Sequence, residues 1–196
     1  MSQNLKKGIA KIGYAMITES PEDGSYVYGD VKWLKSDEAG GREYTAEPNG
    51  ETTEIYADST SVYSAEENNG YDLTVILLAV IDNIEKDWLN NSEIEKGGVL
   101  EIANPKAKPK FALITIDNTT NGNGETTIYF NCSVSKRPKI AGKTTEGSFE
   151  AQFPEYSIAA RPRPADKWVR ATLPQSEEFT TIPEITIKSD ASSTEG

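Results

Sequence analysis

The stretch TTEIYADSTSVYSAEENNGYDLTVILLAVIDNIEKDWL, residues 52–89, contains a predicted strand, turn, strand and helix in direct succession. Residues 55–63 have the composition of a strand that an Asp-Ser turn signal interrupts, and residues 68–70, Asn-Asn-Gly, favour a turn with a left-handed backbone. Residues 73–81 are apolar almost throughout, so we expect a central strand that is covered on both faces. This stretch therefore predicts the core of a β-rich fold.

A short amphipathic helix is expected to follow that strand. Asp82 has the character of an N-cap, and Glu85 stands three residues later, as in the Asp-x-x-Glu form of a capping box. The residues that would share one apolar face of the helix are Ile81, Ile84, Trp88 and Leu89. We expect residues 97–98, Gly-Gly, to end the helix, which would fold back over the sheet.

Further strands are predicted on both sides of this unit. Alternation and β-branched or aromatic composition indicate strands at 9–18, 31–34, 111–116, 126–134 and 149–160, with short ones at 168–169 and 184–188. The polar residues 117–125 would form a hairpin tip, and Pro154 favours an edge position or a bulge for its strand. The sequence therefore predicts a mainly β fold with one flanking α-helix and long loops.

The chain length of 196 residues is typical of one domain, which we place at residues 1–172. Residues 173–196 form a polar C-terminal extension that we expect to be partly disordered. Residues 35–51 are predicted to form a long charged loop without a core of its own. A loop of this length is either a mobile surface segment or an arm that a neighbouring subunit orders.

The composition excludes several classes of function. The chain has 31 acidic and 20 basic residues, a net charge of −11, which disfavours tight binding to the phosphate backbone of nucleic acids. It has no histidine, which excludes Ser-His-Asp catalysis and histidine-ligated zinc. Its one cysteine, the lack of a signal-peptide pattern and the lack of a long apolar run indicate a protein that folds in a reducing cytoplasm and is not inserted in a membrane.

Three short motifs resemble functional sites but lack a required part. Residues 142–144, Gly-Lys-Thr, would end a P-loop, but the position of its first glycine is Arg137. Residues 117–122 resemble the first half of a calcium loop, but its twelfth position, which needs a glutamate, is Ile128. Glu150 and Glu155 could form a glycosidase pair only if the fold sets the right separation. We therefore expect no catalytic residue, cofactor or metal.

Aromatic residues are concentrated in the first third of the chain, and tyrosine and tryptophan are enriched at protein interfaces. The residues concerned are Tyr14, Tyr26, Tyr28, Trp33, Tyr44, Tyr56, Tyr63 and Tyr71. They fit core packing, a subunit interface, or the binding face of a β-sandwich that recognises carbohydrate or a cell surface.

The order of three segments resembles the major tail proteins of long, flexible-tailed bacteriophages. These segments are KKGIAKIGYAMIT at residues 6–18, the stretch 55–89, and the later IYFNCSVSKRP at 128–138 followed by AGKTTEGSFEAQFPEYSIAARPRP at 141–164. The most specific part is Tyr-Ala-Asp at residues 56–58, followed by the Asn-Asn-Gly-Tyr turn, the apolar strand and the helix. The resemblance covers residues 5–170, while the acidic 35–51 segment and the long C-terminal extension depart from the compact pattern.

This resemblance implies a β-sandwich or partial barrel whose function is assembly and not catalysis. Six copies would form a ring, and rings would stack into the tail tube of the virion, through which the genome is delivered. The implied partners are other copies of the chain, the tape measure, tail terminator and distal tail proteins, and DNA passing through the lumen, where a subset of the acidic residues would keep DNA from binding the wall. The residues we expect at the self-assembly interface are Trp33, Arg42, Tyr44, Glu47, Tyr56, Asp58, Tyr63 and Arg161.

Overall fold

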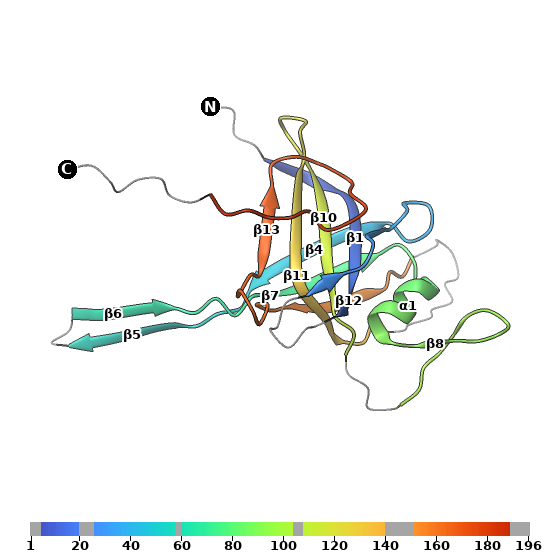
Figure 1. Ribbon diagram of the computed structural model, residues 1–196, viewed down its shortest axis with the longest axis horizontal. Helices are drawn as coiled ribbons and strands as arrows, with labels where there is room; N and C mark the ends of the chain where they lie inside the picture. Colours follow the sequence, from blue (N-terminus) through green and yellow to red (C-terminus); the bar gives the residue numbers. More distant parts are fainter. Residues whose placement is uncertain (1–4, 20–25, 58–59, 104–107, 140–150, 189–196) are drawn as a thin grey trace.

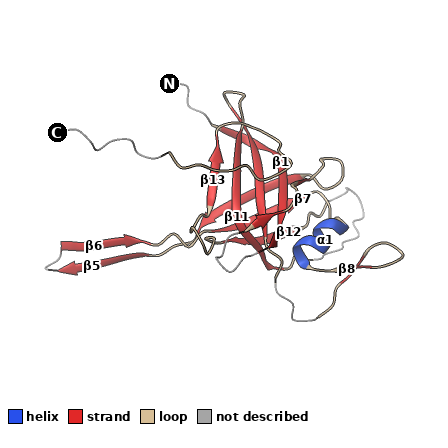
Figure 2. Ribbon diagram, viewed as in Figure 1, coloured by secondary structure: helices blue, strands red, loops and turns tan. Residues whose placement is uncertain are grey.

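The computed structural model describes residues 5–19, 26–57, 60–103, 108–139 and 151–188, with the backbone alone for residue 19 and residues 52–66. The described chain consists of antiparallel β-sheet and one helix (Figures 1 and 2). The elements are β1 (Lys6–Glu19), β2 (Val27–Tyr28), β3 (Lys32–Trp33), β4 (Gly41–Pro48), β5 (Thr52–Ala57), β6 (Thr60–Glu66), β7 (Tyr71–Leu77), α1 (Asp82–Leu89), β8 (Ser92–Glu93), β9 (Val99–Leu100), β10 (Phe111–Thr119), β11 (Glu125–Lys136), β12 (Glu155–Ala160) and β13 (Arg170–Leu173). This confirms the prediction of a mainly β fold with one helix.

The main sheet has the strand order β2-β1-β10-β11-β12-β7-β4, with β3 added to β1 and β13 added to β11. The long strand β11 connects two groups of strands, because its first half pairs with β13 and its second half with β12. In Figure 1, β13, β11, β10 and β1 run roughly vertically, and β4 and β7 cross them. The sheet therefore bends into two crossing layers that enclose the core.

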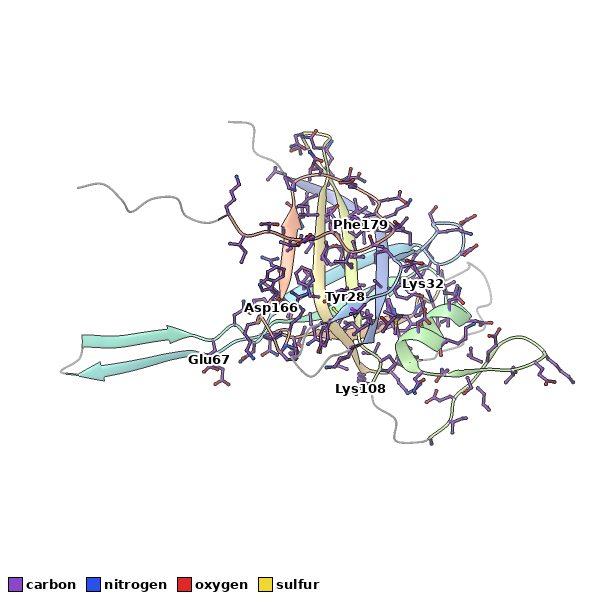
Figure 3. The ribbon with its side chains drawn as sticks, viewed as in Figure 1. Tyr28, Lys32, Glu67, Lys108, Asp166 and Phe179 are labelled. Atoms are coloured by element: carbon purple, nitrogen blue, oxygen red, sulfur yellow. The ribbon has the colours of Figure 1, made fainter. Side chains whose placement is uncertain are left out.

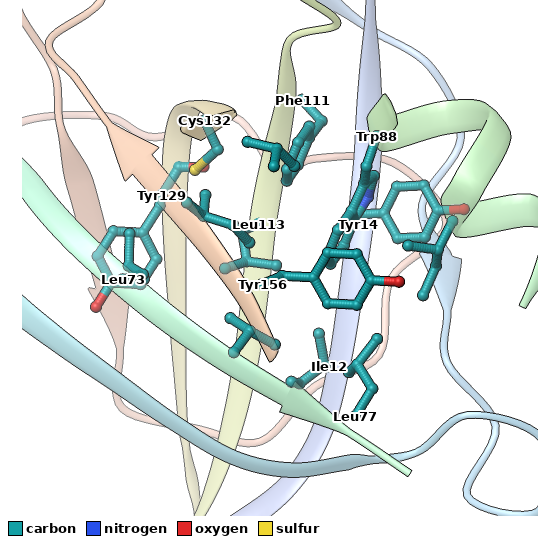
Figure 4. Packing of buried hydrophobic residues seen from close by; sticks show 14 of the residues in the cluster. Ile12, Tyr14, Leu73, Leu77, Trp88, Phe111, Leu113, Tyr129, Cys132 and Tyr156 are labelled. Carbon is teal, nitrogen blue, oxygen red and sulfur yellow. The ribbon is translucent and has the colours of Figure 1, made fainter. Parts of the chain in front are cut away.

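The main core lies between these layers and is closed by α1. Its fully buried aromatic centre is Trp88, whose ring stacks on Phe111 with centroids 4.9 Å apart and receives the ring edges of Tyr14 and Tyr156 (Figure 4). The other buried members are Ile12, Leu34, Leu73, Val75, Leu77, Ile84, Leu89, Leu113, Tyr129, Cys132, Val134, Ile158 and Ala160. Apolar residues thus come from both layers and the helix, and their burial is the dominant stabilising contribution.

A second apolar cluster covers the outer face of the β1, β10 and β11 layer. Successive residues of a strand point to opposite faces, so Leu113 of β10 enters the main core while Ile114 enters this outer cluster. Its other buried members are Ile128 and Phe130, and the partly buried residues packed on them are Tyr28, Val31, Trp33, Trp168, Ala171, Leu173, Phe179, Ile182 and Ile185. Beyond β13, the C-terminal extension therefore contributes three apolar side chains, those of Phe179, Ile182 and Ile185, that cover the sheet from outside.

The described part of the extension, residues 174–188, has no strand but is bonded to the sheet. The amide of Val31 donates to the carbonyl of Thr180 at 2.8 Å, the Trp33 indole donates to the carbonyl of Phe179 at 3.0 Å, and Ser176 N donates to Asn123 O at 2.8 Å. The predicted strand at 184–188 is wrong, because these residues have no strand pairing. The prediction of disorder in the extension falls on its last residues, 189–196, which lie outside the described part.

The predicted loop at 35–51 is wrong for its second half. Residues 41–48 form β4, whose register on β7 runs from Gly41 opposite Leu77 to Pro48 opposite Tyr71. The strand lies at one end of the sheet order and pairs only with β7 among the described residues. Only one face of β4 is in contact with the core, so its sequence remains polar and lacks the apolar alternation of an inner strand.

The central unit also differs from the prediction in detail. β7 is not central, because only β4 lies beyond it, and it ends at Leu77, so that Leu78 and Val80 are exposed. The predicted capping box is wrong, because Ile81 occupies the N-cap without a side-chain hydrogen bond. The helix ends at Asn90, which has the left-handed φ of 58°, and residues 97–98 form the turn between β8 and β9. The buried face of the helix is confirmed.

Two of the predicted strand positions need similar correction. β12 begins at Glu155, directly after Pro154, and lies between β11 and β7, so it is not an edge strand. The short strand expected at 168–169 begins two residues later as β13. The hairpin at 111–134 is confirmed, with the tip at the predicted place.

Candidate functional site

A two-stranded hairpin projects from one end of the molecule (Figure 1). We call residues 49–69 the hairpin arm; it contains β5 and β6 and continues the β4–β7 pair outward. The continuity is made by backbone hydrogen bonds: Asn49 N donates to Gly70 O at 2.8 Å, Asn69 N to Asn49 O at 2.8 Å, and Glu67 N to Glu51 O at 2.9 Å. The arm is therefore an extension of the main sheet and not a loose loop.

Two glycines shape the base of the arm. A Cβ atom on Gly50 would lie 2.0 Å from the carbonyl oxygen of Glu67, and one on Gly70 would lie 2.0 Å from that of Ala160. Gly70 also has a φ of +101°, which side-chain-bearing residues rarely adopt. Only glycine allows the backbone at positions 50 and 70 to approach these carbonyl groups so closely. The two glycines therefore permit the chain to leave the main sheet at this point.

An ion pair fixes the same base from the side. The Arg161 guanidinium donates to Asp72 Oδ1 at 2.6 Å and to the carbonyl of Tyr71 at 2.9 Å, while Asn49 Nδ2 donates to Asp72 Oδ2 at 2.8 Å. The hydrogen bonds from Arg161 and Asn49 lower the pKa of Asp72. The carboxylate of Asp72 thereby joins β7 to the end of β12 and to the start of the arm.

Beyond this base, the backbone of the arm pairs with no other strand in the described part of the chain. β5 pairs with β6 and β6 with β5, and neither belongs to the main sheet. Figure 2 shows no other described element beside them. A two-stranded hairpin without a third strand or a packing partner is at best marginally stable in water. The arm therefore has the architecture of a segment that is completed by contact with another molecule.

The arm is also acidic. It contains Glu51, Glu54, Asp58, Glu66 and Glu67, and no lysine or arginine. The register pairs Thr52 with Glu66 and Glu54 with Ser64, while Thr53 pairs with Ala65 and Ile55 with Tyr63. Five acidic residues and no lysine or arginine give this segment a net charge of −5.

Three residues predicted at the interface have partners inside the chain. Trp33 packs in the outer cluster under Phe179, and the guanidinium of Arg42 lies 3.9 Å from the centroid of the Phe153 ring. The Tyr44 hydroxyl donates to Asp117 Oδ2, inside the sheet. The structure gives each of these side chains a stabilising role, and their part in assembly stays a prediction.

The remaining predicted interface residues lie on or near the arm. Glu47 is exposed on β4, and Arg161 forms part of the arm base. Tyr56 and Tyr63 lie on β5 and β6, where the backbone alone is described, and Asp58 falls outside the described residues. The sequence therefore identified several positions on the arm. It did not show that the projecting segment is formed by residues 49–69 and not by residues 35–51.

The tyrosines of the first third do not form an exposed aromatic face among the residues whose side chains are described. Tyr14 and Tyr26 are buried, and Tyr28, Tyr44 and Tyr71 are partly buried. Tyr28 donates to the carbonyl of Phe130, and burial raises its pKa to about 12. A sugar-binding platform needs aromatic rings open to solvent, so the described rings favour packing as their role.

A charged cluster inside the sheet contains the first residue of the calcium-like motif. Asp117 is 3% exposed and accepts hydrogen bonds from Lys6 Nζ, at 2.8 Å, and from Tyr44. Burial acts to lower the pKa of Lys6, but the hydrogen bonds from its ammonium to Asp117 and Glu125 outweigh burial and raise it. Asp117 therefore joins β1, β4 and β10 through its Oδ2, which accepts both of these hydrogen bonds.

The other candidate motifs give no site in the described part of the chain. The P-loop-like residues 142–144 and Glu150 lie outside this part. In the calcium-like motif, the Thr119 hydroxyl donates to Asn121 Oδ1 at 2.7 Å, at the tip of the β10–β11 hairpin. The described residues contain no group of three or more cysteine or acidic side chains placed to hold a metal. No α-helix within these same residues has the length and apolarity that crossing a membrane requires.

Comparison with known proteins does not assign the chain to a family. No protein-family model and no curated protein sequence matches the chain.

Proposed function

We propose that this protein is a structural subunit that assembles with copies of itself into stacked rings, forming a tube of the kind found in the tails of long-tailed bacteriophages. The observation that carries the proposal is the hairpin arm, which extends the main sheet but has no packing partner within the described chain. The order of sequence segments described above, which resembles that of major tail proteins, supplies the particular kind of assembly.

The geometry favours contacts that repeat without closing on themselves. The arm leaves one end of the molecule, while α1 and the β8–β9 hairpin lie at the other end (Figure 1). A contact between an arm and a different surface of the next copy is heterologous, and heterologous contacts generate rings or open polymers. Rings that stack through such contacts would give a virion conduit for DNA, closed by terminator and distal tail proteins around a tape measure.

A variant that lacks the arm tests the proposal. Replacing residues 49–70 by Asn-Gly joins Pro48 to Tyr71 through a two-residue turn, and these residues are already opposite each other in the β4–β7 register. We expect the variant to remain folded by circular dichroism but to stay monomeric. The wild type should form rings or tubes in negative-stain electron micrographs after concentration.

Two outcomes would contradict the proposal. One is a wild-type protein that stays monomeric at every concentration and ionic strength tested. The other is an arm-deleted variant that forms tubes with the same yield as the wild type. Saturable binding of a glycan by the monomer, unchanged by removal of the arm, would support the carbohydrate- or cell-surface-binding module instead.

A further inference from the structure

Most cations in the described chain already have a carboxylate partner or a ring contact. Ion pairs join Lys6 to Asp117 and Glu125, Lys11 to Glu178, Lys32 to Asp87, Lys35 to Glu38, Lys86 to Glu93, Arg137 to Glu101, Arg161 to Asp72, and Arg163 to Asp166. The guanidinium groups of Arg42 and Arg170 lie over Phe153 and Tyr71. These cations are therefore partly or wholly neutralised within the chain.

Four lysines without a carboxylate partner among the described residues lie together. Lys108 and Lys110 precede β10, and Lys136 and Lys139 lie at and after the end of β11. The two segments meet, because Lys108 Nζ donates to the carbonyl of Ser135 at 3.4 Å. Lys110 Nζ donates to the Tyr26 hydroxyl at 2.9 Å and lies 5.3 Å from the centroid of the same ring, and neither contact supplies a carboxylate. We call these four residues the lysine end of the sheet.

The lysine end is exposed and separate from the arm. All four lysines are exposed, and Figure 3 places Lys108 at the lower end of the sheet while Glu67 lies at the base of the arm. The ion pair of Arg137 with Glu101, at 3.2 Å, lies beside them, and no carboxylate of the described residues pairs with any of the four lysines. In a chain of net charge −11, a cationic surface of this kind is a local exception.

The charge of the arm is the complement of this surface. The arm has five acidic residues and no cation between positions 49 and 69, as its sequence shows. Its strands β5 and β6 have six and seven residues. At roughly 3.3 Å per residue they extend about 20 Å beyond the arm base, which is enough to reach a neighbouring subunit. Opposite potentials that meet across an interface steer association and fix the partner.

We infer that the lysine end of one copy receives the acidic hairpin arm of the next copy. This inference rests on the proposed self-assembly and names the surface that the arm contacts. Because arm and lysine end are different surfaces, the contact is heterologous, and one copy can give its arm to a second while it receives the arm of a third. The positively charged loop at residues 161–170 is a weaker receiver, because Arg161, Arg163 and Arg170 are engaged within the chain.

A charge-exchange experiment tests the inference. The arm variant carries Glu54→Lys and Glu66→Lys, the end variant carries Lys108→Glu and Lys136→Glu, and the combined variant carries all four changes. Each of the first two should raise the critical concentration for assembly by about tenfold or more, because like charges then face each other. The combined variant should recover assembly to within about threefold of the wild type, because opposite charges face again.

A matched control uses lysines elsewhere that also lack a carboxylate partner in the described chain. Lys96 lies at the β8–β9 turn and Lys167 near β13, and both are exposed. Lys96→Glu with Lys167→Glu makes the same change of net charge, so it should leave the critical concentration nearly unchanged. Sedimentation velocity measures assembly, and circular dichroism checks that each variant is folded.

The outcomes separate this inference from the proposed function. If removal of the arm abolishes assembly but the combined variant assembles no better than the two others, the arm binds a different surface and the inference is overturned while self-assembly stands. If the end variant assembles like the wild type but no longer binds a DNA duplex that the wild type binds, the lysine end is a nucleic-acid surface. If the wild-type protein never assembles, both the proposed function and this inference are wrong.

Discussion

Arg161 and Asp72 form an ion pair, with 2.6 Å between Nη2 and Oδ1, at the base of the hairpin arm. Arg161 directly follows β12, and Asp72 lies on β7 next to the point where the chain leaves the main sheet. The pair therefore connects the orientation of the arm to the body of the protein. In the proposed assembly, this contact would fix the direction in which the arm leaves the body.

The order of the arm should depend on pH through Asp72. Its pKa is lowered by the hydrogen bonds from Arg161 and Asn49, so the folded carboxylate holds its proton less tightly than the unfolded one. The stabilising contribution is present above the ordinary carboxyl pKa, about 3.9, and is lost as the pH falls through the lower folded value. Hydrogen-exchange protection factors at Asn49, Glu67 and Asn69 should therefore decrease in this acid range.

The variant Asp72→Asn should remove that pH dependence and lower the protection at neutral pH to about the level that the wild type reaches in acid, because the amide, like the protonated carboxyl, has no charge. The effect on global stability should stay below about 1 kcal/mol, because the pair is largely exposed to solvent. Protection factors in Asp72→Asn that still decrease in the same acid range would show that another carboxylate is responsible.

Gly70→Ala should weaken the arm base more than any surface substitution nearby. The added methyl group would lie 2.0 Å from the carbonyl oxygen of Ala160, and the residue would have to keep a φ of +101°. We expect a loss of about 2 kcal/mol or more in the free energy of unfolding, measured by urea denaturation. Gly97→Ala is the control, since it has φ +84° but no heavy atom within 4 Å of the added Cβ. Equal losses for the two variants would show that φ alone matters.

The sequence predicted the inner strands well because their patterns result from burial. β10 and β11 are covered on both faces by the main core and the outer cluster, so long apolar runs were unambiguous. β4 was missed because an edge strand with one partner keeps a polar sequence, here GREYTAEP. Leu78 and Val80 were assigned to a central strand because apolar composition does not distinguish buried from exposed residues.

The position of the candidate site was harder to predict than the fold. Residues 55–63 have the composition of an ordinary strand, and no local signal shows that both outer edges of a hairpin are unpaired. The lysine end combines two segments nearly thirty residues apart in sequence, which only the β10–β11 register brings together. The hairpin itself was predicted, but residue patterns do not show which lysines lack a carboxylate partner, whereas the glycines at the arm base were visible as turn signals.

Removal of the C-terminal extension should expose the outer face of the sheet. A chain ending at Leu173 loses Phe179, Ile182 and Ile185, which are packed on the cluster of Ile114, Ile128 and Phe130. We expect this variant to bind a hydrophobic dye such as anilinonaphthalene sulfonate and to aggregate, because exposed apolar patches promote association. A chain that ends at residue 188 keeps these contacts and should behave like the wild type. A soluble short variant that binds no dye would show that the extension is dispensable for covering this face.

Trp88→Ala should be the most damaging substitution in the core. The ring is 1% exposed, stacks on Phe111 and contacts Tyr14 and Tyr156, so its loss leaves a large cavity between α1 and both layers. We expect a decrease of about 3–5 kcal/mol in the free energy of unfolding. Trp88→Phe should cost less, because the indole Nε1 has no hydrogen-bond acceptor among the described residues. Leu78→Ala, at an exposed site, should stay within about 0.5 kcal/mol of the wild type.

The thiol of Cys132 should be inert in the folded protein. It is 0% exposed within the main core, and burial raises its pKa to about 12. Because the thiolate is the reactive form, an aromatic disulfide reagent at neutral pH should modify it only as fast as the protein unfolds. The matched control is Ser135→Cys on the exposed end of the same strand, which should react within the mixing time of the experiment. Rapid modification of Cys132 in the native wild type would mean that β11 opens locally and that the main core is not rigid around it.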